Sequence, residues 1–178
     1  SRSVLRLTPG ALSSQRLVQR PGSWPSHLYV HGGLAPTAIE LLVFDPEGVH
    51  RRVPLDAEEI LALRQQDRPV WLRIRGLADR PGITSLLGQL GIPSPLIAPL
   101  IEVPQRPQVD CLDSVVMVVL HRLGSTRVPG FVVSDQVGLL LINGLLITLE
   151  EGAPGDSFPG LTQWLLSNRA APSDRDLD

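Results

Sequence analysis

Lysine is absent from this 178-residue chain, whose 16 basic residues are all arginine. A phosphate-binding P-loop requires a lysine, and so does Schiff-base chemistry, so the composition excludes both. The single cysteine, Cys111, cannot form an internal disulfide or supply a multi-thiolate zinc site. The net charge of −2 gives no attraction toward a polyanion, and we predict no nucleic-acid binding.

Long apolar runs are also lacking. The most apolar stretch, residues 137–149, is far shorter than the ~20 residues that a membrane helix needs. Asn143-Gly144 interrupts it, and these two residues tolerate the positive φ angles of a type I′ turn. The stretch therefore predicts two strands joined by a tight turn. The first residues lack the continuous apolar segment of a signal peptide.

The length is that of one domain with a substantial core. Residues 1–26 are rich in Ser, Arg, Gly and Pro without periodicity, which predicts a flexible lead-in. We assign residues 27–168 to the folded domain. Residues 169–178 are polar and acidic, and we expect a frayed tail there.

Strand and helix signals alternate in the first half of the domain. The turn sequence Asp45-Pro46-Glu47-Gly48 separates two apolar runs and predicts a hairpin of residues 39–44 and 49–53. A D-x-x-E capping arrangement beginning at Asp56 predicts a helix over residues 57–64. Residues 70–75 alternate in polarity, which is typical of a strand with one apolar face.

Two further helices precede the second half of the domain. Asp79 is a candidate cap for a helix with one apolar stripe that ends at Gly91. Another helix is expected over residues 96–101, where Pro99 removes a backbone donor and should shorten or kink it.

Residues 115–120 are apolar at every position, which predicts an internal strand covered on both faces. We expect strands 139–142 and 145–149 to flank it. A helix over residues 158–167 then closes the domain, with one face formed by Phe158, Leu161, Trp164 and Leu165. Interleaved helices and frequent hairpins predict an α/β fold with a mixed, partly antiparallel sheet sandwiched between helical layers.

No pattern in the chain requires catalysis. His31-Gly32-Gly33 resembles part of an oxyanion loop, but no G-x-S-x-G follows it, and a turn is the favoured interpretation. Cys111 and His121 could meet only across a chain reversal, and a buried structural cysteine is more typical. We predict no catalytic residues and no enzyme activity.

Metal-ligand spacing is likewise missing. Asp110 and Asp113 are separated by an odd number of residues, so on an undisturbed strand they face opposite sides. We predict no metal ligands and no firmly bound cofactor. Four histidines show no spacing of a ligand cluster and are interpreted as surface or half-buried residues: His27, His31, His50 and His121.

Arg73 and Arg75 share a predicted strand face with Trp71. This face is either a surface for anions or stacking, or a sheet face that long side chains cover with the tryptophan beneath. We favour cover, because the net charge gives no support for a polyanion partner.

Three stretches occur in an order that is typical of one family. They are VWLRIRGL (70–77), PQRPQVDCLDSVVMVVLHRL (104–123) and SDQVGLLLINGLLITLEEG (134–152). Together they resemble the N-terminal cytosolic domain of the CorA family of magnesium and cobalt channels, over roughly residues 39–166. The sequence has no Gly-Met-Asn pore signature, no membrane span and no long stalk helix.

The resemblance implies a domain of a cytosolic funnel in a homopentamer, at the cytoplasmic face of the inner membrane. In that family, carboxylates between subunits hold divalent ions, Mg²⁺ or Co²⁺, which keep the pore shut. Ala98 and Pro99 stand where many members have an acidic pair, and neither Glu102 nor Asp176 is assigned as a ligand in their place. Arg106 matches the family's turn arginine, whose fork is expected to fix the turn.

The resemblance implies a regulatory domain of a divalent-cation transporter, with residues 169–178 as the start of the stalk helix. By itself the chain is expected to be a monomer or weak dimer. The alternative is a stand-alone CorA-like module that acts in protein interaction without ion conduction.

Overall fold

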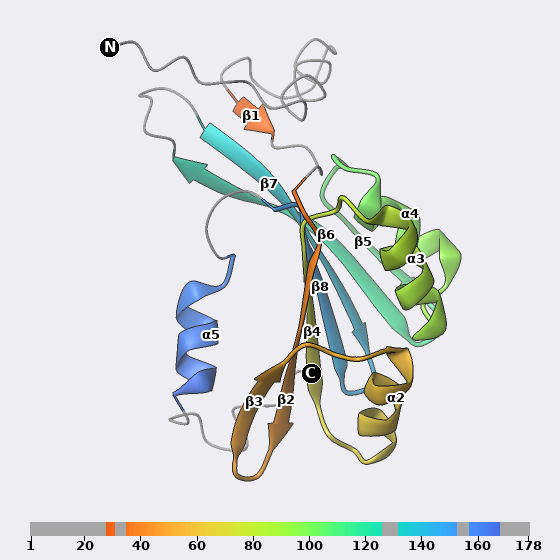
Figure 1. Cartoon of the computed structure of the whole chain (residues 1–178). Helices are drawn as coiled ribbons and strands as arrows, with labels where there is room; N and C mark the ends of the chain where they lie inside the picture. Colours follow the sequence, from red (N-terminus) through yellow and green to blue (C-terminus); the bar gives the residue numbers. More distant parts are fainter. Residues whose placement is uncertain (1–27, 31–34, 126–131, 153–156, 168–178) are drawn as a thin grey trace.

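The computed structural model describes residues 28–30, 35–125, 132–152 and 157–167 (Figure 1). The predicted lead-in over residues 1–26 and the tail over 169–178 lie outside them. The described strands form one mixed sheet in the order β3-β2-β4-β8-β7-β6-β5, and β1 pairs with β7 off this path. The β4–β8 and β1–β7 pairs are parallel and the others antiparallel. The strands are β1 (Leu28–Val30), β2 (Ala38–Asp45), β3 (Gly48–Arg52), β4 (Val70–Arg75), β5 (Gln108–Leu112), β6 (Val115–Ser125), β7 (Val132–Ile142) and β8 (Leu145–Glu150).

Helices lie on both faces of the sheet, as predicted for the α/β class (Figure 1). Three of them cover one face and α5 lies on the other. They are α2 (Ala57–Gln65), α3 (Arg80–Gln89), α4 (Ser94–Ile101) and α5 (Pro159–Leu166). Among the described residues, no helix has the length and apolarity needed to cross a bilayer.

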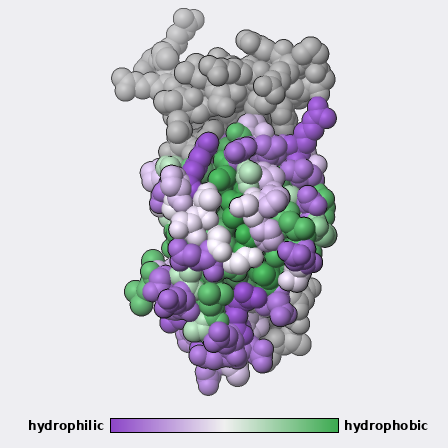
Figure 2. Space-filling model, turned by 90° about the vertical axis from the view of Figure 1, so that its right-hand side faces the viewer, coloured by the Kyte–Doolittle hydropathy of each residue, from purple (hydrophilic) through white to green (hydrophobic). Residues whose placement is uncertain are grey.

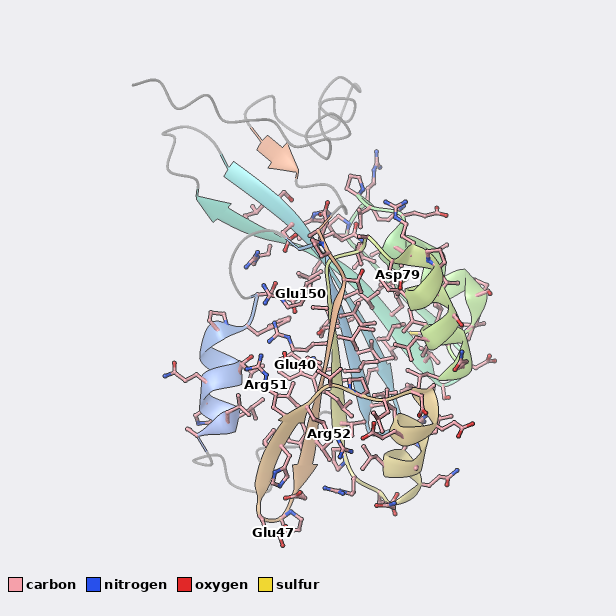
Figure 3. All side chains as sticks on the ribbon, viewed as in Figure 1. Glu40, Glu47, Arg51, Arg52, Asp79 and Glu150 are labelled. Carbon is pink, nitrogen blue, oxygen red and sulfur yellow. The ribbon has the colours of Figure 1, made fainter. Side chains whose placement is uncertain are left out.

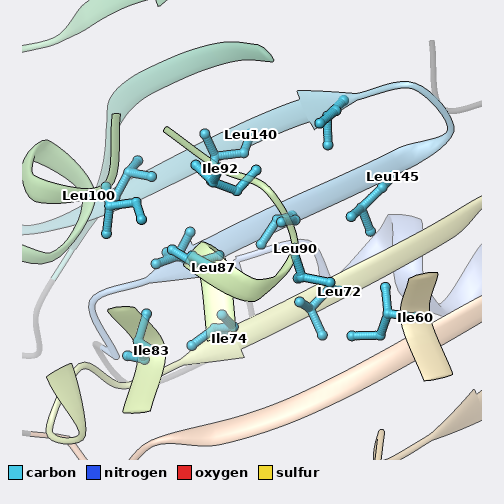
Figure 4. Close-up of a cluster of buried hydrophobic side chains, with 14 of the residues drawn as sticks. Ile60, Leu72, Ile74, Ile83, Leu87, Leu90, Ile92, Leu100, Leu140 and Leu145 are labelled. Atoms are coloured by element: carbon cyan, nitrogen blue, oxygen red, sulfur yellow. The ribbon is translucent and has the colours of Figure 1, made fainter. Parts of the chain in front are cut away.

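The larger apolar core lies between the sheet and helices α2, α3 and α4 (Figure 4). Leu72 and Ile74 of β4 and Leu140 of β7 meet Ile60 and Leu87 of the helices there, and all five are fully buried. A smaller cluster lies on the α5 side, formed by Leu42, Phe44, Val49, Trp71 and Leu165. Hydrophilic residues dominate the outer surface of the three-helix side, with apolar residues in a central band (Figure 2).

Local capping chemistry sets the helix ends as predicted. The Asp56 carboxylate accepts from the Glu59 amide at 2.9 Å, and Asp79 accepts from the Gly82 amide at 3.0 Å. Gly91 follows α3 with a φ of 84°. These contacts satisfy backbone groups that a helix cannot pair internally.

The cover predicted for residues 115–120 is present on one face only. Val115, Met117 and Val119 are buried in the larger core, whereas Val116 and Leu120 are 37% and 39% exposed. The prediction of two covered faces is therefore wrong. The reason is that α5 lies over the β2–β4 half of the sheet and leaves the β5–β6 half without a described helix (Figure 1).

The neighbours of β6 also differ from the prediction. β6 lies between β7 and β5, while β8 pairs with β7 and β4. The hairpin partner β5 was not predicted, because the turn at Asp113-Ser114 contains no glycine. Asp113 takes the positive φ of 55° that the tight turn requires.

The predicted apolar face of α5 is corrected in part. Leu165 is buried and Phe158 packs against the smaller core, but Leu161 and Trp164 are 45% and 40% exposed. Thr162, which is buried, takes the place between Phe158 and Leu165 on the inner face. The inner face of α5 therefore combines a polar contact from Thr162 to Arg73 with two apolar side chains.

Gly76, directly after β4, permits a close approach of two chain segments. Its φ is +78°, and a Cβ there would overlap the Pro36 carbonyl oxygen and lie 2.6 Å from that of Ala35. We predict that Gly76→Ala lowers the free energy of unfolding by about 2 kcal/mol or more, measured by urea denaturation. Gly88→Ala is the control, because Gly88 is helical and has open space around it. This substitution should raise the free energy of unfolding by about 0.5–1 kcal/mol. Equal effects of the two substitutions would contradict the prediction.

Candidate functional site

The polar groups buried on the α5 side of the sheet centre on Arg73, which is 2% exposed. Its Nε and Nη2 donate to Glu150 Oε1 at 3.1 and 2.7 Å, and Nη1 donates to Thr162 Oγ1 at 3.2 Å. Glu150 and Glu40 lie on this side of the sheet, facing α5 (Figure 3). One guanidinium therefore joins β4, β8 and α5.

Aromatic rings enclose the same guanidinium. Its central carbon lies 5.1 Å from the centroid of the Trp71 ring and 5.6 Å from that of Phe158. Trp71 itself donates from Nε1 to Thr148 Oγ1 at 3.0 Å. The cover interpretation is right in placing Trp71 beneath, but Arg73 does not face solvent, because α5 covers it. Cation–π attraction is strongest in such desolvated sites.

We predict that Arg73→Met lowers the free energy of unfolding by about 3–5 kcal/mol, because it removes both close hydrogen bonds to the buried Glu150 carboxylate and leaves the longer contact from Arg75 Nε, at 3.6 Å. Urea denaturation at pH 7 measures the change. The double variant Arg73→Met/Glu150→Gln should recover a large part of the loss. Arg51→Gln is the control, because it removes an ion pair between Glu40 and an arginine side chain that is 58% exposed. It should lower the free energy of unfolding by less than about 1 kcal/mol. A loss below 1 kcal/mol for Arg73→Met would contradict the assigned role.

A second polar cluster surrounds Gln136 of β7, whose side chain is buried. Its Oε1 accepts from the Gln105 amide at 2.7 Å, and its Nε2 donates to the Pro99 carbonyl at 3.0 Å. His121 holds Gln105 from the other side, with Nε2 2.7 Å from the Gln105 carbonyl and Nδ1 3.1 Å from Ser134 Oγ. These contacts fix the end of α4 and the segment after it on the sheet.

The fork of Arg106 was predicted to fix this turn, and that prediction is wrong. Arg106 is exposed, and no hydrogen bond or ion pair joins it to the part of the chain that the structure describes. Gln136 and His121 hold the neighbouring Gln105 instead, because their side chains project from the sheet and reach its backbone.

Glu151 lies beside this cluster and is completely buried. Its Oε2 accepts from the Gln136 amide at 2.9 Å, while Oε1 has no hydrogen-bond partner among the described residues. Burial raises the pKa of Glu151 to about 8, with a further rise from the Asp135 charge and a partial offset from the Gln136 amide. Asp135 itself pairs with Arg122 at 3.2 Å. Glu151 is therefore mainly protonated at pH 7.

This protonation predicts how stability depends on pH. The pKa of Glu151 rises from 4.5 to about 8 on folding, so its stabilisation is complete below pH 4.5 and is lost as the pH rises toward 8. We expect Glu151→Gln to flatten the decline in unfolding free energy between pH 5 and 8, by up to about 1.4 kcal/mol per pH unit. Urea denaturation at several pH values measures this.

Glu102→Gln is the matched control for that experiment, since Glu102 is exposed. It should leave the pH profile of the wild type unchanged. A Glu151→Gln profile as steep as that of the wild type would show that another group controls the decline.

Cys111 and His121, the pair weighed as a thiol catalyst, lie on opposite faces of the sheet. Cys111 is opposite Val116 in the β5–β6 register, so the two share a face of the sheet. His121 is an odd number of residues further along β6 than Val116, so it lies on the other face. The expectation that Cys111 fills the core is wrong, because β5 is the edge strand and all its residues are exposed.

The other candidate ligands do not converge. Asp110 is on β5 and Asp113 in the following turn, so the two acids do not share the one strand that was assumed. His50 is exposed and lies 3.0 Å from Asp45, whereas His27, His31 and Asp176 lie outside the described residues. Within the described segments, no three His, Cys, Asp or Glu side chains are grouped to hold a metal ion.

The positions singled out on α4 also hold no ligand side chain. Ala98 and Pro99 are half-buried, and Glu102 beyond the helix is exposed. Pro99 contributes only its carbonyl, to Gln136. Sequence reasoning missed the cluster around Gln136 and Glu151. The available signal was the run Ser134-Asp135-Gln136, which interrupts an otherwise apolar strand.

Comparison with known proteins finds similarity in sequence to one transport protein. The chain is 25% identical over 160 residues to the cobalt/magnesium transport protein CorA of Thermotoga maritima. The match covers 89% of this chain and 45% of that protein, so the chain spans less than half the length of its curated relative. No protein-family model matches the sequence.

Solved structures share the fold. The ZntB cytoplasmic domain of Vibrio parahaemolyticus matches with a TM-score of 0.52 at 15% identity, over 74% of this chain and 50% of that one. Full-length CmaX matches with a TM-score of 0.54 at 16% identity, over 73% and 39%. The soluble domain of CorA from Methanocaldococcus jannaschii matches with a TM-score of 0.50 at 12% identity, over 74% and 47%. The chain thus has a CorA-like soluble-domain fold and resembles CorA in sequence.

Proposed function

We propose that the chain is the cytosolic regulatory domain of a divalent-cation transporter of the CorA type, with Mg²⁺ or Co²⁺ as the transported or regulatory ion. The 160-residue match to a cobalt/magnesium transport protein carries this proposal. The shared fold with the ZntB and CorA soluble domains supports it. In this proposal the domain has no catalytic activity of its own.

The β5–β6 half of the sheet, over which no described helix lies, supports a role within a larger assembly. Val109, Val116 and Leu120 expose 68%, 37% and 39% of their surface on neighbouring strands β5 and β6. Apolar side chains gathered in this way favour a covering partner. We propose that a further part of the same transporter covers them, in a homopentamer at the cytoplasmic face of the membrane.

Regulation in this proposal does not use the α4 positions, because the side chains of Ala98 and Pro99 cannot ligate a cation. The described residues also hold no ready-made metal cluster. A regulatory ion would instead be held by carboxylates that come together only in the assembled protein. Such an ion offsets the repulsion between like charges across an interface.

The test uses the complete gene and its product. We expect the reading frame to continue beyond Asp178 into two apolar spans with a Gly-Met-Asn sequence, and the purified protein to admit Mg²⁺ or Co²⁺ into proteoliposomes. A variant that lacks residues 1–178 should still conduct but should lose inhibition by the ion on the cytosolic side. A stop codon directly after Asp178 would contradict the transporter proposal and favour the stand-alone interaction module.

A further inference from the structure

The strand pairing along β7 has a gap on the side that faces β8. β8 pairs with β7 as far as Val137, and β1 pairs with the same side of β7 up to Ser134, while β6 occupies the other side throughout. Glu151 fills this gap. Its amide donates to the Gln136 carbonyl at 3.0 Å, and its Oε2 accepts from the Gln136 amide at 2.9 Å. A side chain therefore completes the sheet at a point where backbone pairing stops.

Glu151 has no compensating cation among the described residues. It is completely buried, and no group of the described residues bonds to its Oε1. Glu150, one residue earlier, is also buried but lies 2.7 Å from Arg73 Nη2. The two adjacent acids thus have opposite surroundings, one with a close counter-charge and one without. An isolated buried carboxylate is so costly that the group takes up a proton instead.

The charged groups on the strands beside Glu151 do not favour its ionisation. Asp135 of β7 adds a repulsive charge. Three basic residues on neighbouring strands already have partners: Arg122 of β6 with Asp135, Arg75 of β4 with Glu150, and His121 of β6 with the Gln105 carbonyl. A negative charge on Glu151 would therefore be the second one buried at this point.

Gln136 connects the gap to α4. Its side-chain Oε1 accepts from the Gln105 amide at 2.7 Å, and its Nε2 donates to the Pro99 carbonyl at 3.0 Å. One residue therefore joins Glu151, through its backbone, to the end of α4, through its side chain. Displacement of Glu151 from β7 removes both of these backbone partners of Gln136 and loosens the position of its side chain.

We propose that Glu151 is a pH switch. In its protonated form it closes the gap between β8 and β1, and when ionised it moves away from β7, admits water and releases the contacts of Gln136 with α4. The movement is favourable because a carboxylate regains its hydration only where water reaches it.

Linkage gives the pH range of this switch. The pKa of Glu151 is about 8 in the closed form, against 4.5 for a glutamate in water. The open population therefore rises between pH 4.5 and 8, by up to about tenfold per pH unit, and levels off above pH 8. The protonated, closed form is fully stable only at the acidic end of that range.

Amide hydrogen exchange of the 178-residue chain, followed by NMR between pH 5.5 and 7.5, tests the switch. After correction for the intrinsic exchange rate, the protection factors of the Gln105, Gln136 and Glu151 amides should fall at least about tenfold. The Val70 amide is the reference, because it donates to the Gly144 carbonyl at the opposite end of β8. Its protection factor at pH 7.5 should be at least about tenfold higher than the other three. Equal protection of all four amides would indicate global unfolding and overturn the proposal.

Glu151→Gln separates the switch from other causes of pH dependence. The glutamine has nearly the same shape and no charge at any pH, so the Gln105 and Gln136 amides should keep their protection up to pH 7.5. A melting temperature at pH 5.5 close to that of the wild type shows that this variant is folded. Glu102→Gln is the matched control, because Glu102 is exposed just after α4 and its loss should leave the fall in protection unchanged.

Two results would contradict the switch. One is a fall in protection in Glu151→Gln as large as in the wild type, and the other is protection in the wild type that does not change with pH. Neither measurement involves transport, so the outcome is independent of the transporter proposal.

Discussion

The parallel pairing of β4 with β8 is the contact on which the rest of the structure depends. It joins the β2–β3 hairpin, which pairs with β4, to β7, β6 and β5, which follow β8 in the sheet. On one face it sets Leu72 and Ile147 in the main core, and on the other it brings Arg73 to Thr148 and Glu150. Because Thr162 of α5 bonds to Arg73 of β4, α5 packs against a sheet face that this long-range pairing builds.

Local chemistry made much of the fold predictable. Asp56 and Asp79 cap the helices that they were expected to cap, and Asn143-Gly144 forms the turn inside the most apolar run. These features depend on a few neighbouring residues and a backbone angle. The resemblance to CorA domains added the order of the elements, which the shared fold confirms.

Features that depend on distant contacts were harder to predict. An all-apolar strand predicts two covered faces, but Val116 and Leu120 face outward because α5, the helix described on that side, lies over β2–β4 instead. Arg73 was expected to cover the sheet, whereas it is buried with Glu150, whose position 77 residues later gives no local signal. The burial of both Glu150 and Glu151 likewise follows from the fold, since neighbouring residues in the sequence give no signal that either carboxylate is buried.

The β5 edge of the sheet affects how two copies of the molecule could meet. β5 presents Val109 and Leu112 to water, with Asp110 between them. If the β5 strands of two copies paired in antiparallel fashion about Asp110, the Asp110 carboxylates of the two copies would come close together. This repulsion disfavours edge-to-edge pairing of two copies through β5.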